Sequence, residues 1–406
     1  MASTLPLGEP IPDQGPLTPD AVDAVGQKPL GIYLHVPFCT TRCGYCDFNT
    51  YTAEELGVGA SRADYLDSAI DELLTARHLL GPNAAPISSL FVGGGTPTLL
   101  PSGQLVGFLQ RVNEEFGFQP DAEISIESNP ESVDAMALEE LRSGGFTRIS
   151  FGMQSAQPAV LKMLDRRHTP GRGQSAVLEA RAAGFEHINL DLIYGAPGET
   201  DEDWQASLDA AVAVAPDHVS AYALIVEDGT RLGADVARGQ VQVADDDALA
   251  HRYVMADESL SRAGLTWYEV SNWSTPTGQC QHNLAYWRSY DWWGIGPGAH
   301  SHVAGVRWWN HKHPSTYAAA LREGRSPAAA REVLTAEQMH DEDVLLRLRL
   351  LEGLEVADLG ESARRRATVA AAEGLLDPLA LQNGRAVLTL AGRLLADRLA
   401  VELLTV

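Results

Sequence analysis

Six short runs of β-branched and other apolar residues recur between residues 31 and 226, and amphipathic stretches separate them. The runs cover residues 32–36, 90–92, 123–128, 148–154, 188–194 and 219–225. Strands that alternate with helices long enough for right-handed crossovers build a parallel sheet. The sequence therefore predicts an α/β fold with a partial (β/α)6 barrel over residues 29–226.

Polar residues occupy one face of several predicted strands. Residues two apart in a strand point to the same side of the sheet, so Ser125 and Glu127 share one face. The same alternation points a further set inward: Tyr33, His35, Arg148, Ser150, Gly152, Gln154, Asn189 and Asp191. A purely structural barrel core would be filled by Val, Ile and Leu. We therefore expect a wet cavity that holds a polar ligand, with a self-satisfied hydrogen-bond network as the alternative.

Changes in composition along the chain define the expected domains. Residues 1–28, rich in Pro, Gly and Asp with no basic residue before Lys28, are predicted to be a disordered tail. Residues 227–330 hold seven of the eight tryptophans and several histidines, and we expect an aromatic α+β second lobe there. Residues 331–406 combine Leu-rich helical stretches with a hairpin predicted over residues 379–388, where Asn383-Gly384 suits a tight turn. This pattern predicts a winged-helix-like C-terminal domain.

The overall charge limits the classes of partner. The chain has 54 acidic and 30 basic residues, and its net charge of −24 argues against nucleic acid or an anionic membrane surface as a general partner. No apolar run approaches the roughly 20 residues that a membrane-spanning helix needs. Four cysteines, three of them close together, indicate a reducing cytoplasmic setting and a metal site rather than a disulfide framework.

Three cysteines stand in one short segment directly after the first predicted strand. Their spacing is Cys39-x3-Cys43-x2-Cys46, in the kind of loop where barrel enzymes carry their active sites. Three thiolates satisfy three irons of a cubane and leave the fourth iron open, so the spacing favours a [4Fe-4S] cluster. A zinc site completed by His35 or Cys280, and ordinary free thiols, are the alternatives.

A glycine run, Gly93-Gly-Gly-Thr96, follows the second predicted strand, where a ligand can approach the backbone closely. Together with the cysteine triad and Glu127, this run resembles the radical-SAM superfamily in order and in distance along the chain. In that superfamily the open iron of the cluster binds S-adenosylmethionine. The resemblance therefore implies the same cofactor here.

Longer stretches resemble the oxygen-independent coproporphyrinogen oxidase family. They span residues 33–98, 126–130, 148–155 and 191–197, and the likeness covers nearly the whole chain after the tail. Carried over by position, the resemblance implies that the cluster-bound S-adenosylmethionine lies against Tyr33, Tyr45, Gly94, Gly95, Thr96 and Glu127. It implies that a second S-adenosylmethionine would be contacted by Gln154, Arg166 and Asp191. Arg166 rests on the resemblance alone, and a surface helix cation is its alternative.

Two departures separate the chain from these oxidases. The oxidases carry a further cysteine two residues after the third cluster ligand, where this chain has Phe48. The segment His282-Asn-Leu-Ala-Tyr-Trp287 resembles the H-N-x-x-Y-W element of the HemW family of haem chaperones, in which it is associated with haem binding. A neutral imidazole is a good haem-iron ligand. The resemblance thus implies His282 as a haem ligand, with Cys280 as a second candidate and a hydrogen-bonded, loop-orienting histidine as the alternative.

These features together predict a cytoplasmic haem chaperone built on a radical-SAM barrel, which binds haem and passes it to apo-haemoproteins. The runner-up is an enzyme that removes two carboxyl groups from coproporphyrinogen III to give protoporphyrinogen IX. A third hypothesis is radical modification of another small molecule, because most barrel residues serve the cofactor rather than the substrate. The sequence does not decide whether the chain forms a homodimer.

Overall fold

A 12-stranded sheet dominates the computed structural model, which describes residues 8–56 and 62–404. Its strand order is β12-β11-β10-β9-β1-β2-β3-β4-β5-β6-β8-β7. The strands are β1 Leu30–Val36, β2 Ile87–Gly94, β3 Phe118–Ser128, β4 Arg148–Gln154, β5 His187–Tyr194, β6 His218–Ala223, β7 Thr266–Glu269, β8 Asn272–Ser274, β9 Asp291–Ile295, β10 His300–Val303, β11 Val306–Asn310 and β12 Ala328–Val333.

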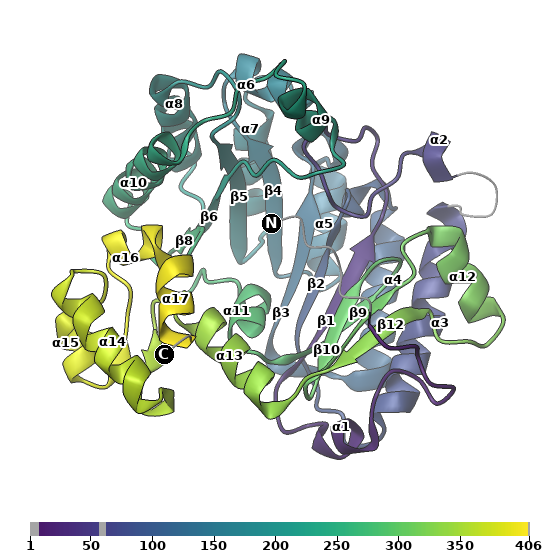
Figure 1. The fold of residues 1–406 in the computed structure, drawn as a ribbon. Coiled ribbons are helices and arrows are strands. Elements are labelled where there is room, and N and C mark those ends of the chain that lie inside the picture. The colour runs from purple at the N-terminus through teal and green to yellow at the C-terminus, as the bar shows by residue number, and fades with distance from the viewer. Residues whose placement is uncertain (1–7, 57–61, 405–406) are drawn as a thin grey trace.

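The barrel part of this sheet confirms the predicted strands. β1 to β6 follow one another in parallel pairs, and each contains most of the run expected from the sequence. Parallel strands align their carboxyl ends, so the loops after them open at one end of the barrel. The helices around the outside are α3 Arg62–Leu80, α4 Ser102–Phe116, α5 Ala135–Ser143, α7 Arg172–Ala182, α8 Asp201–Val212 and α10 Asp246–Arg262 (Figure 1).

The main hydrophobic core lies between the barrel strands and these outer helices. The apolar residues of each strand, such as Leu34, Ile126 and Leu190, are fully buried. Trp204 of α8 is also fully buried, and its indole nitrogen donates to the Arg252 carbonyl on α10 at 2.9 Å. Because the apolar face of each strand packs outward, the polar face is left to line the interior.

Residues 227–330, expected as a second lobe, add their strands to both edges of the barrel sheet. β9 pairs in parallel with β1, and β10, β11 and β12 continue antiparallel from it. At the other edge β8 pairs antiparallel with β6. An uncovered sheet edge leaves backbone groups unpaired, and these strands satisfy them. The helices of this region besides α10 are α9 Arg231–Ala237, α11 Gln281–Trp287 and α12 Pro314–Arg322.

The predicted disordered tail is wrong for residues 8–28, while residues 1–7 lie outside the described residues. α1 (Pro19–Ala24) is capped by the Thr18 side chain and buries Ala21. Glu9 forms a β-bridge with Arg331 of β12, whose guanidinium donates to the Pro16 carbonyl at 2.8 Å. Composition alone missed that a few residues of this segment pair with the sheet edge and pack on the core.

The predicted hairpin over residues 379–388 is also wrong. Asp377 caps a helix there, accepting hydrogen bonds from the amides of Leu379 and Ala380 at 2.8 Å. The segment after it pairs instead with a distant strand, so β13 Leu354–Glu355 and β14 Arg385–Ala386 form a small antiparallel sheet. The helices of this region are α13 Ala336–Arg347, α14 Glu361–Ala372, α15 Pro378–Gln382, α16 Leu390–Leu394 and α17 Ala396–Leu404.

Short helical segments complete the described chain. They are α2 Ala53–Leu56, α6 Pro158–Met163 and the 3-10 turns Pro97–Leu99, Pro130–Ser132 and Val356–Asp358. No helix within residues 8–56 and 62–404 combines the length and apolar character that crossing a membrane requires.

Candidate functional site

The three cysteines of the predicted cluster site lie in the loop after the carboxyl end of β1. All three carry free thiols and are partly buried. The Cys39 amide donates to the Tyr51 carbonyl at 3.0 Å and the Cys46 amide to the Cys43 carbonyl at 3.2 Å, which folds the loop back on itself. Burial is the main cause that raises the pKa of Cys39 to about 11, and the nearby Cys46 adds to it. Such thiols are costly to ionise together, and bound iron would stabilise their thiolates.

The glycine run at the end of β2 packs directly against this cluster loop. The Gly95 amide donates to the Val36 carbonyl at 2.8 Å and the Thr96 amide to the Phe38 carbonyl at 2.7 Å. A Cβ on Gly95 would lie 2.4 Å from the Phe38 carbonyl oxygen and 3.0 Å from the Cys39 sulfur. Only glycine lets the backbone pass so close to Phe38 and Cys39, so this glycine allows β2 and the cluster loop to pack together.

Asn49 ties the cluster loop to two segments far away in the sequence. Its Nδ2 donates to the Pro297 carbonyl at 2.9 Å and to the Lys312 carbonyl at 2.8 Å. Its own carbonyl is hydrogen-bonded to Nε2 of His35 at 2.9 Å. The loop that carries the cysteines is therefore joined to the turn before β10 and to the turn after β11.

The ligands of the zinc alternative do not complete the cysteine triad. Both ring nitrogens of His35 are taken, by the Tyr33 hydroxyl and the Asn49 carbonyl, each at 2.9 Å. Cys280 lies 3.3 Å from Glu123, at the amino-terminal end of the barrel. Within the described ranges, no three His, Cys, Asp or Glu side chains form a ligand set for one metal ion. Neither His35 nor Cys280 therefore supplies a fourth ligand, and three thiols without a fourth protein ligand are the donor set that a cubane with one open iron needs.

The inner face of the barrel is polar, as the strand alternation predicts, and it surrounds a cavity. The Asn189 amide donates to Ser150 Oγ at 2.6 Å and to Asp191 Oδ1 at 2.7 Å, so part of this face satisfies itself. The two alternatives drawn from the sequence, cavity and internal network, are therefore both present. The cavity is lined by Tyr33, Phe91, Glu127, Arg148, Ser150, Asn189, Asp191, His218, Ser220, Tyr222, Tyr268, Asn272, Cys280, His282, Asn283 and Tyr286.

Two half-buried carboxyl groups face the cavity. Glu127 accepts from the Gly94 amide at 2.9 Å, and Asp191 accepts from Ser150 Oγ at 2.7 Å. Removal from water is the main cause that raises the pKa of Glu127 to about 8, and the neighbouring Asp191 adds to it. Removal from water also raises the pKa of Asp191. A cationic ligand would relieve this accumulation of acidic groups. S-adenosylmethionine carries a sulfonium charge, so the cavity suits its chemistry.

Arg166, in the segment after α6, faces the cluster loop. Its Nη2 lies 3.3 Å from the Tyr45 hydroxyl, and its Nε is buried with no hydrogen-bond partner among the described residues. Gln154, with a left-handed φ of 65°, places its amide 2.8 Å from where a Gly152 Cβ would be. Gln154 and Arg166 thus both lie near Gly152, whereas Asp191 lines the main cavity and Arg166 a separate one. Next to the cluster loop, a second cavity is lined in part by Arg42, Arg166, Arg167, His168 and Arg172.

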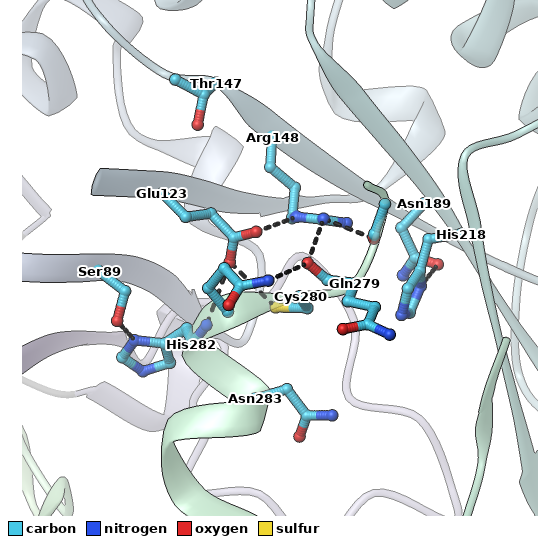
Figure 2. A network of polar contacts seen from close by, with 12 residues as sticks. Ser89, Glu123, Thr147, Arg148, Asn189, His218, Gln279, Cys280, His282 and Asn283 are labelled. Carbon is cyan, nitrogen blue, oxygen red and sulfur yellow. Dashed lines mark hydrogen bonds and ion pairs between the residues drawn. The ribbon is translucent and has the colours of Figure 1, made fainter. Parts of the chain in front are cut away.

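A buried ion pair closes the opposite end of the barrel (Figure 2). Arg148 Nε donates to Glu123 at 2.8 Å, and the side chains are only 2% and 6% exposed. Arg148 also donates to the Gly278 and Gln279 carbonyls at 2.6 and 3.0 Å. Glu123 accepts from the His282 amide at 3.2 Å. Burial would raise the pKa of Glu123, but Arg148 and the amides that begin α11 hold it below its usual range. The pair therefore fixes where α11 starts.

His282 forms part of the cavity floor, and both of its ring nitrogens are occupied. Nδ1 is hydrogen-bonded to Ser89 Oγ at 2.8 Å and Nε2 to the Tyr286 hydroxyl at 2.9 Å. The ring stacks on Phe91 with centroids 5.3 Å apart, and the residue is 2% exposed. Burial lowers the pKa of His282 to about 4, so the imidazole is neutral at neutral pH. These contacts match the loop-orienting alternative, and iron ligation would require the ring to leave a partner.

Sequence reasoning missed the contribution of β6 to the cavity. His218, Ser220 and Tyr222 all line it. His218 is hydrogen-bonded to Asn189, and its Nε2 lies 2.8 Å from the Tyr268 hydroxyl. The period-two spacing of these polar residues within β6 is the signal that could have found them.

Comparison with known proteins assigns the chain to a family. A profile of the Radical SAM superfamily matches residues 33–211, which hold the cluster loop and most of the barrel. Over 391 residues the chain is 51% identical to the haem chaperone HemW of Mycobacterium tuberculosis strain H37Rv, covering 96% of this chain and 99% of that protein. The chain belongs to the HemW family of radical-SAM proteins.

More distant HemW proteins match most of the same length. The HemW of Escherichia coli K12 is 34% identical over 329 residues, 80% of this chain and 83% of that protein. Among solved structures, coproporphyrinogen III oxidase (HemN) from Escherichia coli superposes with a TM-score of 0.80 at 24% identity, over 95% of this chain and 92% of that one. This HemW family member therefore shares its fold with that radical-SAM enzyme.

The Glu123–Arg148 pair yields a prediction about the stability of the HemW fold. Glu123→Gln leaves the Arg148 guanidinium buried without its carboxylate, and we expect a loss of about 3–5 kcal/mol in the free energy of unfolding. The control is Glu186→Gln, which breaks the far more exposed Arg142–Glu186 pair and should cost about 1 kcal/mol or less. Urea unfolding of the two variants measures both values. Equal effects would contradict a stabilising role for the buried pair.

Proposed function

We propose that this protein binds haem and delivers it to apo-haemoproteins while carrying a [4Fe-4S] cluster and S-adenosylmethionine. The similarity to proteins named haem chaperones carries the proposal, because it runs over nearly the whole chain rather than over the barrel alone. The cysteine triad, the glycine run and the inward carboxyl groups support it as parts that bind the two cofactors. Haem is the cargo, and apo-haemoproteins are its recipients.

Cys39, Cys43 and Cys46 would hold the cluster in this proposal. The backbone at Gly94 and Gly95 packs against the cluster loop, and the Glu127 carboxyl group accepts from the Gly94 amide at 2.9 Å. When bound, the reduced cluster supplies one electron to the sulfonium of S-adenosylmethionine, and this chemistry belongs to the cofactors. The chain keeps three thiols together and offers hydrogen-bonding and charged groups that orient the ligand.

A series of rings supports an interaction with haem. It leads from His282 to Tyr286, Trp292 and His302, with successive centroid distances of 4.9, 4.7 and 5.1 Å. Large aromatic side chains bury much apolar area against a flat partner and stack on it. Tyr286 and Trp292, the two partly exposed rings of this series, therefore offer aromatic area beside α11 for a flat macrocycle.

An oxygen-independent coproporphyrinogen III oxidase is the second candidate function, and the fold shared with HemN favours it. In that reaction two propionate side chains of the substrate would be oxidatively decarboxylated. Phe48 stands against it, because the oxidases carry a cysteine at this position. The Phe48 side chain is 56% exposed and offers no thiol next to the cluster loop.

The two functions predict opposite outcomes with anaerobically reconstituted protein. The chaperone should bind haem at a defined stoichiometry, pass it to an apo-haemoprotein, and form no protoporphyrinogen IX from coproporphyrinogen III, S-adenosylmethionine and reductant. Absorption spectra follow haem binding and transfer, and chromatography of the porphyrins follows turnover. Steady formation of protoporphyrinogen IX without specific haem binding would contradict the chaperone function and support the oxidase function.

The cluster proposal predicts about four irons and four sulfides per chain. Replacing Cys39, Cys43 or Cys46 by Ala should abolish the cluster, because each thiolate holds a different iron. Cys280→Ala is the matched control and should keep the full iron content, since Cys280 lies beside Glu123 at the other end of the barrel. Iron and sulfide analysis measures the result, and one zinc without sulfide in the wild type would contradict the proposal.

Glu127→Ala should weaken S-adenosylmethionine binding about ten- to hundredfold while leaving the fold and the cluster intact. The reason is that Glu127 faces the cavity, where it accepts from the Gly94 amide, rather than the helix layer. Glu139→Ala, at an exposed position of α5, serves as the control. Titration calorimetry on both variants gives the affinities. An unchanged affinity of Glu127→Ala would mean that this carboxyl group does not contact the ligand.

A further inference from the structure

The histidines of this protein differ sharply in whether their ring nitrogens are free to bind iron. His35, His218 and His282 are buried, and both nitrogens of each ring have hydrogen-bond partners. Releasing one of these nitrogens would leave a buried polar group without its hydrogen-bond partner, which is unfavourable. A histidine that ligates haem iron is better placed where a nitrogen already faces open space.

His300, the first residue of β10, meets this condition. The residue is exposed, and neither ring nitrogen has a hydrogen-bond partner in the part of the chain that the structure describes. It stands directly across from Trp309 on β11, with ring centroids 6.0 Å apart and planes 29° apart. The imidazole is thus supported on one side by an indole and open on the other.

The face around His300 is aromatic and continuous with α11. Trp292 on β9 donates its indole N–H to the His300 carbonyl at 3.1 Å and is only half-buried. On α11, the Tyr286 ring packs edge-on against the Trp292 ring, with centroids 4.7 Å apart. Trp292 therefore links Tyr286 of the H-N-x-x-Y-W element to the backbone of His300.

Charge around His300 also suits haem. Partial burial lowers the pKa of His300, and the positive charges of Lys312 and Arg307 lower it further. The ring is therefore neutral at neutral pH, the form that ligates iron. Arg307 is already paired with Glu332 and Glu342, whereas Lys312 is exposed. The Lys312 ammonium is thus available to a haem propionate.

We propose that His300 presents the imidazole that binds haem iron, with the macrocycle against Trp292 and a propionate at Lys312, while His282 orients α11 below. The proposal rests on the haem-chaperone function and names the place where the cargo is held. It gives the H-N-x-x-Y-W element a supporting part, because Tyr286 forms one wall of the aromatic surface and His282 holds Tyr286 through its hydroxyl.

The test is a haem titration of full-length protein whose cluster has been reconstituted anaerobically, so that the cluster thiols are not free. The variants are His300→Ala and His282→Ala, with the exposed His78→Ala of α3 as the matched control. We expect His300→Ala to shift the haem absorption spectrum and raise the dissociation constant about tenfold or more. His78→Ala should match the wild type.

Imidazole rescue separates ligation from a general structural effect. Added imidazole should restore the wild-type spectrum in His300→Gly by occupying the vacated position, and it should have no such effect on His282→Ala. Lys312→Ala should weaken haem binding without moving the absorption bands, because it removes a propionate partner and not the iron ligand. Cluster content and tryptophan fluorescence report whether each variant is folded.

Two outcomes would overturn the proposal and are distinct from failure of the haem-chaperone function. If His282→Ala moved the spectrum and His300→Ala did not, the iron ligand would be His282 while haem binding itself stood. If neither variant changed the spectrum, the ligand would lie elsewhere. Absence of any specific haem complex with the wild type would instead refute the haem-chaperone function.

Discussion

The buried ion pair between Glu123 and Arg148 positions the start of α11, whose residues line one end of the cavity. The pair joins β3 to β4, and α11 begins directly beside it (Figure 2). Arg148 holds the carbonyls before α11, and Glu123 holds the amide of His282 within its first turn. Neither charge would be stable alone in this environment. The shape of the cavity above thus depends on one long-range electrostatic contact.

The barrel and the phase of its strands could be predicted because both follow from local periodicity. Alternation along each strand placed Glu127 and Asp191 inside, where the structure has them. The Glu123–Arg148 pair could not be predicted, since it joins two strands to a segment more than a hundred residues later in the chain. The hairpin prediction failed because the turn preference of Asn383-Gly384 was outweighed by a helix cap at Asp377. Short-range signals alone do not rank such competing contacts.

Sequence motifs draw attention to His282, whereas physical accessibility draws attention to His300. The two residues are linked through Tyr286 and Trp292, so a motif on α11 can matter for haem without supplying the iron ligand. A hydrogen-bonded histidine in a short helix fixes the positions of its neighbours. A histidine with free nitrogens at a strand end can instead exchange a ligand. A haem ligand that must release its haem to another protein is better placed at an exposed position, and His300 is exposed.

Asn49 connects the loop of the three cysteines to the turns on either side of β10 and β11. Its amide holds the backbone on either side of the β10–β11 pair, while its own chain segment begins at the cluster cysteines. Coupling between two sites is reciprocal, so an event at the cluster loop that moves Asn49 also changes the surface that includes Lys312 and His300. If the proposed [4Fe-4S] cluster binds in this loop, gain or loss of its iron would be felt at Pro297 and Lys312 through the amide of Asn49.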